Sequence, residues 1–163
     1  MSTKTLVVFY SVSGQTRLVA DIITAMLHGD QFEIQTEQPI KPDLFSRYYG
    51  GGKAMLSKIP PKLKPASLSI TDYDKILVGF PNWASHCPPA VKEFIRQNDF
   101  SGKQVYLFTT YVARGGAPCL RNTASLFPNS HVQIMDAFSL PKSKKKPVLA
   151  MHIQETLHHV NLL

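Results

Sequence analysis

The chain has 163 residues, and its 18 Lys and Arg against 11 Asp and Glu give a formal charge of +7. Hydrophobic residues make up 44% and charged residues 18%, which excludes an intrinsically disordered chain and predicts a single domain over residues 1–163. No apolar run approaches the roughly 20 residues that span a bilayer, so a membrane-spanning role is excluded.

The distribution of charge and cysteine indicates the kind of partner and compartment. The excess of positive charge favours an acidic partner or another polyanion. The two cysteines, Cys87 and Cys119, lie far apart, and the N-terminus runs directly into a strand pattern without a leader sequence. We therefore expect a cytoplasmic protein with reduced thiols.

Strand-like and helix-like segments alternate along the chain. Apolar runs rich in β-branched and aromatic residues predict strands at 6–10, 32–34, 76–80, 105–110 and 132–138. Helical spacing predicts helices at 17–27, at 90–96, from about 118, and at the end of the chain with Val148, Met151 and Leu157 on its apolar face. A short helix is expected near 53–57, after a Gly-rich bend. Because apolar strands separated by helices form parallel sheets covered on both faces, the expected fold is a three-layer α/β sandwich.

A hydroxyl-rich turn follows the first strand and precedes a helix, at residues 11–16 with the sequence SVSGQT. The free N–H groups and dipole of a helix N-terminus attract anions, and the hydroxyls of Ser11, Ser13 and Thr16 can donate to a phosphate. The alternative is that Ser13 or Thr16 only caps the helix. The segment lacks both the lysine of triphosphate-binding loops and the G-x-G-x-x-G pattern, so we expect a monophosphate rather than ATP or NAD.

Two further loops follow strands that should end at the same edge of the sheet. The loop at 81–89, PNWASHCPP, contains the only tryptophan, Trp83, which could stack on a flat heterocycle or pack beneath the loop. This loop has no glycine, so only Asn82 is expected to tolerate a positive φ. The loop at 110–117 contains Gly115 and Gly116.

The three loops together resemble those of the flavodoxin family. The first loop matches the family pattern [ST]-x-[ST]-G-x-[ST] at every position, and residues 79–89 are similar to a [GY]-x-P-x-W segment. The fifth strand has no insertion, so the resemblance is to the short-chain type. It implies a flavodoxin-like three-layer sandwich with a five-stranded parallel sheet in the order 2-1-3-4-5 and a non-covalently bound FMN. The residues that the resemblance places at the cofactor are Ser11, Val12, Ser13, Gly14, Gln15, Thr16, Pro81, Asn82, Trp83, Ala84, Thr110, Tyr111, Gly115 and Gly116.

The implied function is electron transfer, with the flavin carrying the redox step and no protein residue acting as a catalyst. The partner would be a redox protein or a small-molecule electron acceptor. One alternative is an FMN-dependent NAD(P)H oxidoreductase acting on quinones, nitro or azo compounds, although no NAD(P)H site is recognisable. Another is a non-catalytic binding module on the same fold. Specific nucleic-acid binding is not expected, because the basic run at 142–146, which we expect in a solvated loop, has no interleaved aromatic residues.

The cysteines and histidines show no spacing typical of a metal site. We expect Cys87 and Cys119 to be ordinary loop and core residues. No carboxylate partner can be identified from the sequence for any of the histidines His28, His131 or His152. No metal is therefore expected.

Overall fold

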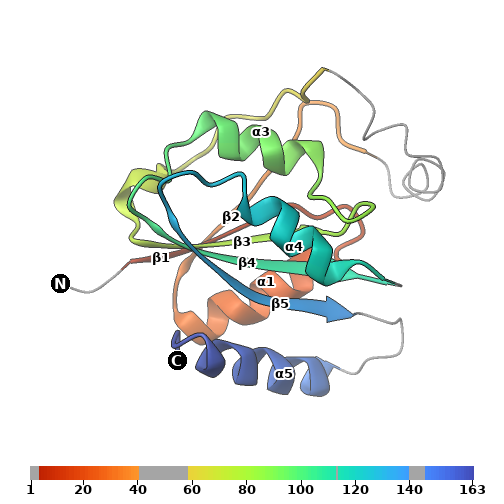
Figure 1. Cartoon of the computed structure of the whole chain (residues 1–163), viewed down its shortest axis with the longest axis vertical. Coiled ribbons are helices and arrows are strands. Elements are labelled where there is room, and N and C mark those ends of the chain that lie inside the picture. Colours follow the sequence, from red (N-terminus) through yellow and green to blue (C-terminus); the bar gives the residue numbers. More distant parts are fainter. Residues whose placement is uncertain (1–3, 41–58, 113, 140–145) are drawn as a thin grey trace.

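The computed structural model describes residues 4–40, 59–112, 114–139 and 146–163. Five strands form one parallel sheet in the order β2-β1-β3-β4-β5 (Figure 1). The strands are β1 (Thr5–Phe9), β2 (Asp30–Glu33), β3 (Lys75–Pro81), β4 (Gln104–Tyr111) and β5 (His131–Ser139). The predicted fold class and strand order are confirmed, whereas the helix expected near 53–57 falls outside the described residues.

Helices cover both faces of this sheet. They are α1 (Gln15–Leu27), α3 (Pro89–Gln97), α4 (Gly116–Ala124) and α5 (Lys146–His159), with a 3-10 helix, η1, at Ile70–Asp72. Figure 1 shows α3 and α4 on one face and α1 and α5 on the other, which makes three layers. None of the described helices is long and apolar enough to cross a membrane.

The alternation of side chains along each strand produces two separate apolar cores. On β3, Val78 packs in the core beneath α3 and α4, while its neighbour Leu77 packs in the core beneath α1 and α5. Both residues are fully buried. A Cβ placed on Gly79 would collide with the ring of Phe108, so the close approach of β3 and β4 requires glycine there. The central strands are therefore buried on both faces, as their continuous apolar sequences predict.

The last helix differs from the prediction in its buried face. Val148 and Met151 are exposed, at 56% and 63%, whereas Leu157 is buried as predicted, together with Leu149 and Ile153. Both sets have helical spacing, so the periodicity could not rank them. Lys146, expected in a solvated loop, is exposed but is the first residue of α5; 142–145 lie outside the described residues.

The edge strand β5 contains one irregularity. Leu107 pairs with Ile134 whereas Phe108 pairs with Asp136, so Met135 is an extra residue in a β-bulge. Asp136 lies against α5, where its Oδ2 is 2.7 Å from His152 Nε2. His152 therefore has a carboxylate partner that could not be identified from the sequence, because the pairing joins a strand and a helix.

Candidate functional site

The three loops singled out in the sequence lie at one edge of the sheet. Each follows the carboxyl end of a strand, and the registers Phe9 with Gly79 and Pro81 with Thr110 bring the ends of β1, β3 and β4 side by side. In an open α/β sheet this edge is where ligands bind. We call residues 11–16 the first loop, 81–88 the second loop and 110–116 the third loop.

The first loop leaves the N-terminus of α1 open. Gly14 is the N-cap, has φ +83°, and brings no side chain to the cap. In the described part of the chain, the backbone amides of Gly14, Gln15 and Thr16 have no hydrogen-bond acceptor. The alternative in which Ser13 or Thr16 caps the helix is therefore wrong; Ser11 Oγ instead accepts from the Arg17 amide at 3.3 Å. A Cβ added at Gly14 would meet nothing within 4 Å, so an anion can approach the free amides.

Thr16 joins the first loop to the third. The residue is only 2% exposed, and its Oγ1 lies 2.8 Å from Oγ1 of Thr110, which is 3% exposed. The two residues are 94 positions apart in sequence. Their contact places a buried hydroxyl pair directly under the open amides of α1.

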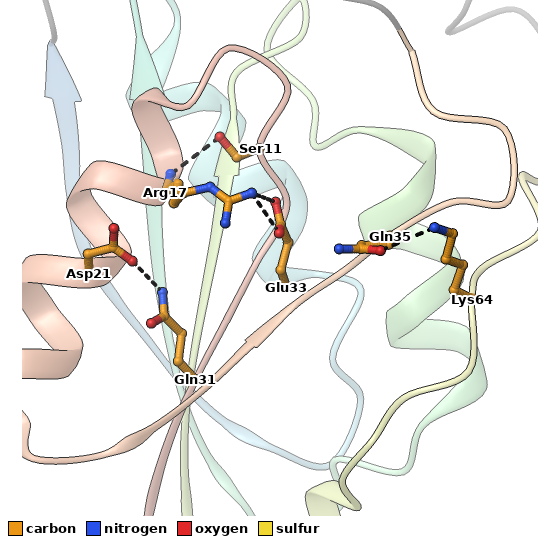
Figure 2. A network of polar contacts seen from close by, with 7 residues as sticks. All are labelled: Ser11, Arg17, Asp21, Gln31, Glu33, Gln35 and Lys64. Atoms are coloured by element: carbon orange, nitrogen blue, oxygen red, sulfur yellow. Dashed lines mark hydrogen bonds and ion pairs between the residues drawn. The ribbon is translucent and has the colours of Figure 1, made fainter.

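An ion pair that the sequence analysis missed flanks the first loop (Figure 2). Arg17 donates through Nη2 to both carboxylate oxygens of Glu33, at 2.6 and 2.7 Å, and its guanidinium lies 5.7 Å from the centre of the Phe9 ring. Glu33 ends β2 and is in register with Phe9 of β1. The only signal that could have found this pair is the strand order, which places the end of β2 beside the end of β1. Glu33 thus neutralises a cation in the first turn of α1.

The second loop is a closed hairpin. Trp83 and His86 exchange backbone hydrogen bonds of 2.9 Å in both directions, and the two residues between them, Ala84 and Ser85, have φ of 49° and 67°. Positive φ at both central residues is the geometry of a type I′ turn. The expectation that only Asn82 would suit a positive φ was wrong, because the hairpin register imposes this backbone on Ala84 and Ser85.

Asn82 is the polar centre that connects the second and third loops. It is 9% exposed; its Nδ2 donates to the Arg114 carbonyl at 2.6 Å and its Oδ1 accepts from the Ser85 amide at 2.9 Å. Its backbone amide donates to the Thr110 carbonyl at 2.8 Å. Gly115, with φ +88°, packs against it so closely that a Cβ would come within 3.0 Å of Asn82 Nδ2. The two loops therefore form one preassembled unit.

Trp83 lies in the core beneath α3 and α4. It is 3% exposed, and its ring meets that of Tyr10 edge-on with centroids 6.3 Å apart. The two rings line a cavity of about 200 Å³, together with Thr36, Gln38, Ile40, Ile59, Pro61, Pro89 and Ala90. Burial raises the pKa of the Tyr10 hydroxyl. The packing alternative describes Trp83 in this structure, and its contact with a flavin ring stays a prediction.

Of the remaining residues of the third loop, Gly116 is buried, whereas Val112 and Arg114 are exposed. Gly116 is buried, and a Cβ there would collide with Ala137 and approach Tyr111. Val112 is 72% exposed and the Arg114 side chain is also exposed. The loop therefore presents an apolar and a cationic side chain to solvent at the ligand edge.

The cysteines are structural residues of the core beneath α3 and α4. Both Cys87 and Cys119 are free and buried. Burial raises the pKa of both thiols, that of Cys119 to about 12, so neither is a thiolate at neutral pH. Among the described residues no group of three or more His, Cys, Asp or Glu side chains could hold a metal ion.

The fold and the open first loop define a flavodoxin-like flavoprotein. A family model described as flavodoxin matches residues 4–155, so the chain belongs to the flavodoxin family, whose cofactor is FMN. The family and the fold inferred from the three loops are thus confirmed.

Solved structures show the same fold at low sequence identity. A putative flavoprotein from Bacteroides uniformis is 24% identical, with 94% of this chain and 99% of that chain covered and a TM-score of 0.79. A flavoprotein from Lactobacillus acidophilus in complex with FMN is 19% identical, with 83% and 92% covered and a TM-score of 0.66. A Fusobacterium nucleatum flavodoxin bound to flavin mononucleotide is 12% identical, with 98% of both chains covered and a TM-score of 0.56. The comparison with curated proteins gave no match.

The residues of the site fit this cofactor. FMN carries a terminal monophosphate, and the first loop offers free amides at a helix N-terminus, a glycine with positive φ and a buried hydroxyl pair. The first loop contains no lysine, unlike the loops that bind nucleoside triphosphates. The carboxyl edge beside it is formed by the second and third loops, which Asn82 joins.

Proposed function

We propose that this protein binds FMN non-covalently at the three loops and acts as an electron-transfer flavoprotein. The observation that carries the proposal is the open N-terminus of α1, where Gly14 has a positive φ and the first amides have no acceptor within the described residues. The amides of an uncapped helix end are left to bond either water or a ligand. A phosphate satisfies them and is favoured by the helix dipole.

The three loops bind two different parts of FMN. The first loop holds the phosphate through the amides of Gly14 to Thr16 and the hydroxyls of Ser11 and Ser13, with Val12 contributing its backbone. Pro81 to Ala84 and the third loop, from Thr110 and Tyr111 to Gly116, hold and orient the ring. Bound FMN supplies the capacity to accept and release electrons. The chain itself positions the flavin ring. Asn82 holds the second and third loops together before any ligand binds.

The surface beside the third loop favours an acidic redox partner. Val112 and Arg114 are both exposed there, and the whole chain carries a formal charge of +7. An exposed apolar residue next to a cation suits docking of a protein whose own surface is negative, and complementary charge speeds the encounter. A small-molecule acceptor could use the same edge. The two free buried cysteines fit a reducing compartment, the cytoplasm.

The first test is titration of apo-protein with FMN and with riboflavin, followed by flavin fluorescence. The proposal expects FMN to bind much more tightly, because riboflavin lacks the phosphate that the first loop holds. Equal affinities would show that the loop does not bind phosphate.

A second assay separates the carrier from the oxidoreductase. The FMN-loaded protein is mixed with NADH or NADPH and a quinone, and nucleotide oxidation is followed at saturating acceptor. A carrier reacts negligibly with the nucleotide but exchanges electrons with a reductase protein. Rapid turnover with NAD(P)H alone would overturn the carrier role and leave the cofactor assignment intact.

A further inference from the structure

The contact between Thr16 and Thr110 contains one more hydrogen-bond donor than it uses. The two hydroxyl oxygens are 2.8 Å apart, and either can be the donor. Each hydroxyl has one proton, and a single bond between them consumes one. Neither hydroxyl has a second hydrogen-bond partner among the described residues, and the two threonines are only 2% and 3% exposed. One proton is therefore left to donate to a group outside the pair.

The surroundings of the pair indicate where that proton goes. Thr16 lies in the first turn of α1, and its own backbone amide is one of those without an acceptor. An anion at this helix end would attract the free proton to the Thr16 hydroxyl, which then has to accept from Thr110. Thr110 is held in place from the other side, because its carbonyl accepts from the Asn82 amide at 2.8 Å. Hydrogen bonds arranged in such a chain strengthen one another.

We propose that Thr110 is a positioning residue for phosphate recognition: its hydroxyl donates to Thr16, so that the Thr16 hydroxyl donates to the phosphate of the ligand. The inference rests on the proposed function and extends it, because it assigns the β4 end a part in telling a phosphorylated flavin from an unphosphorylated one. Thr110 needs no contact with the phosphate itself. Its effect passes through one hydroxyl.

Thr109 provides a matched control on the same strand. It is fully buried, and its Oγ1 donates to the Phe80 carbonyl at 2.7 Å. Adjacent strand residues point to opposite faces, so Thr109 points toward α4, away from α1. Replacing either threonine by valine removes one buried hydroxyl with little change in volume.

The experiment compares the dissociation constants of FMN and riboflavin for apo-protein carrying Thr110→Val, Thr110→Ser or Thr109→Val. Thr110→Val should lower the preference for FMN over riboflavin, measured as the ratio of the two dissociation constants, about tenfold, the size expected for losing a hydrogen bond to a charged group. Thr110→Ser keeps the hydroxyl and should restore the preference for FMN. Thr109→Val should leave the ratio of the two affinities at the wild-type value.

The possible outcomes separate this inference from the proposed function. If the wild-type protein prefers FMN but Thr110→Val weakens both flavins equally, or neither, the inference is overturned and the proposed function stands. If the wild-type protein binds both flavins equally or not at all, both fall. Should Thr110→Val fail to fold, Thr110→Cys, which keeps the volume and is a weaker donor, replaces it; an unchanged FMN preference in that variant also overturns the inference.

Discussion

The first and second loops lie at the same edge of the sheet but are built in opposite ways. In the first loop the amides of Gly14 to Thr16 have no acceptor among the described residues, and the added volume of a Cβ at Gly14 would meet nothing. In the second loop the backbone of Trp83 and His86 is paired in both directions, and Asn82 holds the turn from beneath. One loop is open, and the other is closed on itself.

This difference indicates that the first loop contributes mainly to ligand affinity and the second loop mainly to the stability of the fold. An open loop contributes little to the folded state on its own and gains its hydrogen bonds from a ligand. A closed loop contributes its bonds and packing to folding and gives the ligand a surface that is already in position, which lowers the entropic cost of binding. Variants in the second loop should therefore cost stability first, and variants in the first loop should cost affinity first.

The largest expected effect is that of Trp83→Ala. Because Trp83 is 3% exposed and packs on Tyr10, the change should lower the free energy of unfolding of the apo-protein by about 3–5 kcal/mol, measured by urea denaturation. Trp83→Phe fills most of the space and is the control. If Trp83→Ala costs less than about 1 kcal/mol, Trp83 is not a core residue. If Trp83→Phe weakens FMN binding without lowering stability, the predicted ring contact is supported.

Asn82→Ala should have the next largest effect on stability. It removes the bonds to the Arg114 carbonyl and the Ser85 amide and leaves both groups partly buried, so the free energy of unfolding should fall by about 2 kcal/mol. Asn122→Ala is the control, since it removes one exposed bond to the Ser85 carbonyl and should cost under about 1 kcal/mol. Thermal unfolding of the apo-proteins gives both values. Equal losses for the two variants would contradict the central position of Asn82.

Gly14→Ala tests whether the open first loop contributes to FMN affinity rather than to stability. Alanine at φ +83° costs about 1 kcal/mol of stability, and the new methyl group points into the space where the phosphate would approach, so FMN affinity should fall about tenfold. Gly102→Ala is a matched control, with φ +73° and nothing within 4 Å of its Cβ, in a turn before β4 far from the three loops. It should lose the same stability and keep its FMN affinity. A loss of affinity in both variants would show that strain, rather than access to the amides, limits binding.

Glu33→Gln should have the smallest effect and the opposite sign. Without its carboxylate, Arg17 is free to turn toward the first loop, and FMN should bind about two- to threefold more tightly at low salt, with the gain shrinking as salt rises. Stability should change by less than about 1 kcal/mol, since the ion pair is partly exposed. Asp21→Asn removes the same charge from the same surface without contacting Arg17 and should give less of this gain. Equal gains in both variants would mean that only net charge matters.

The features that the sequence predicted correctly are those set by neighbouring residues. Alternation of apolar strands with helices predicts the layered sheet, because burial of both faces demands continuous apolar strands. The turn at 11–16 was predicted between the first strand and a helix, and it lies between β1 and α1. The strand order came with the resemblance that these loops carry, and the sheet has that order.

The rest required the tertiary structure, because it depends on pairs of residues that only the packing of the fold brings together. Thr16 meets Thr110, and Arg17 meets Glu33, only because β1 lies between β2 and β3 and next but one to β4. The positive φ at Ala84 and Ser85 follows from the closure of a hairpin and not from the preference of either residue. The sequence by itself thus determined the class of fold and the position of the turn between β1 and α1 that we propose binds phosphate, which local periodicity and turn chemistry specify. Only the register of the strands decided which buried hydroxyls and charges stand around that loop, since no local rule relates residues 94 positions apart.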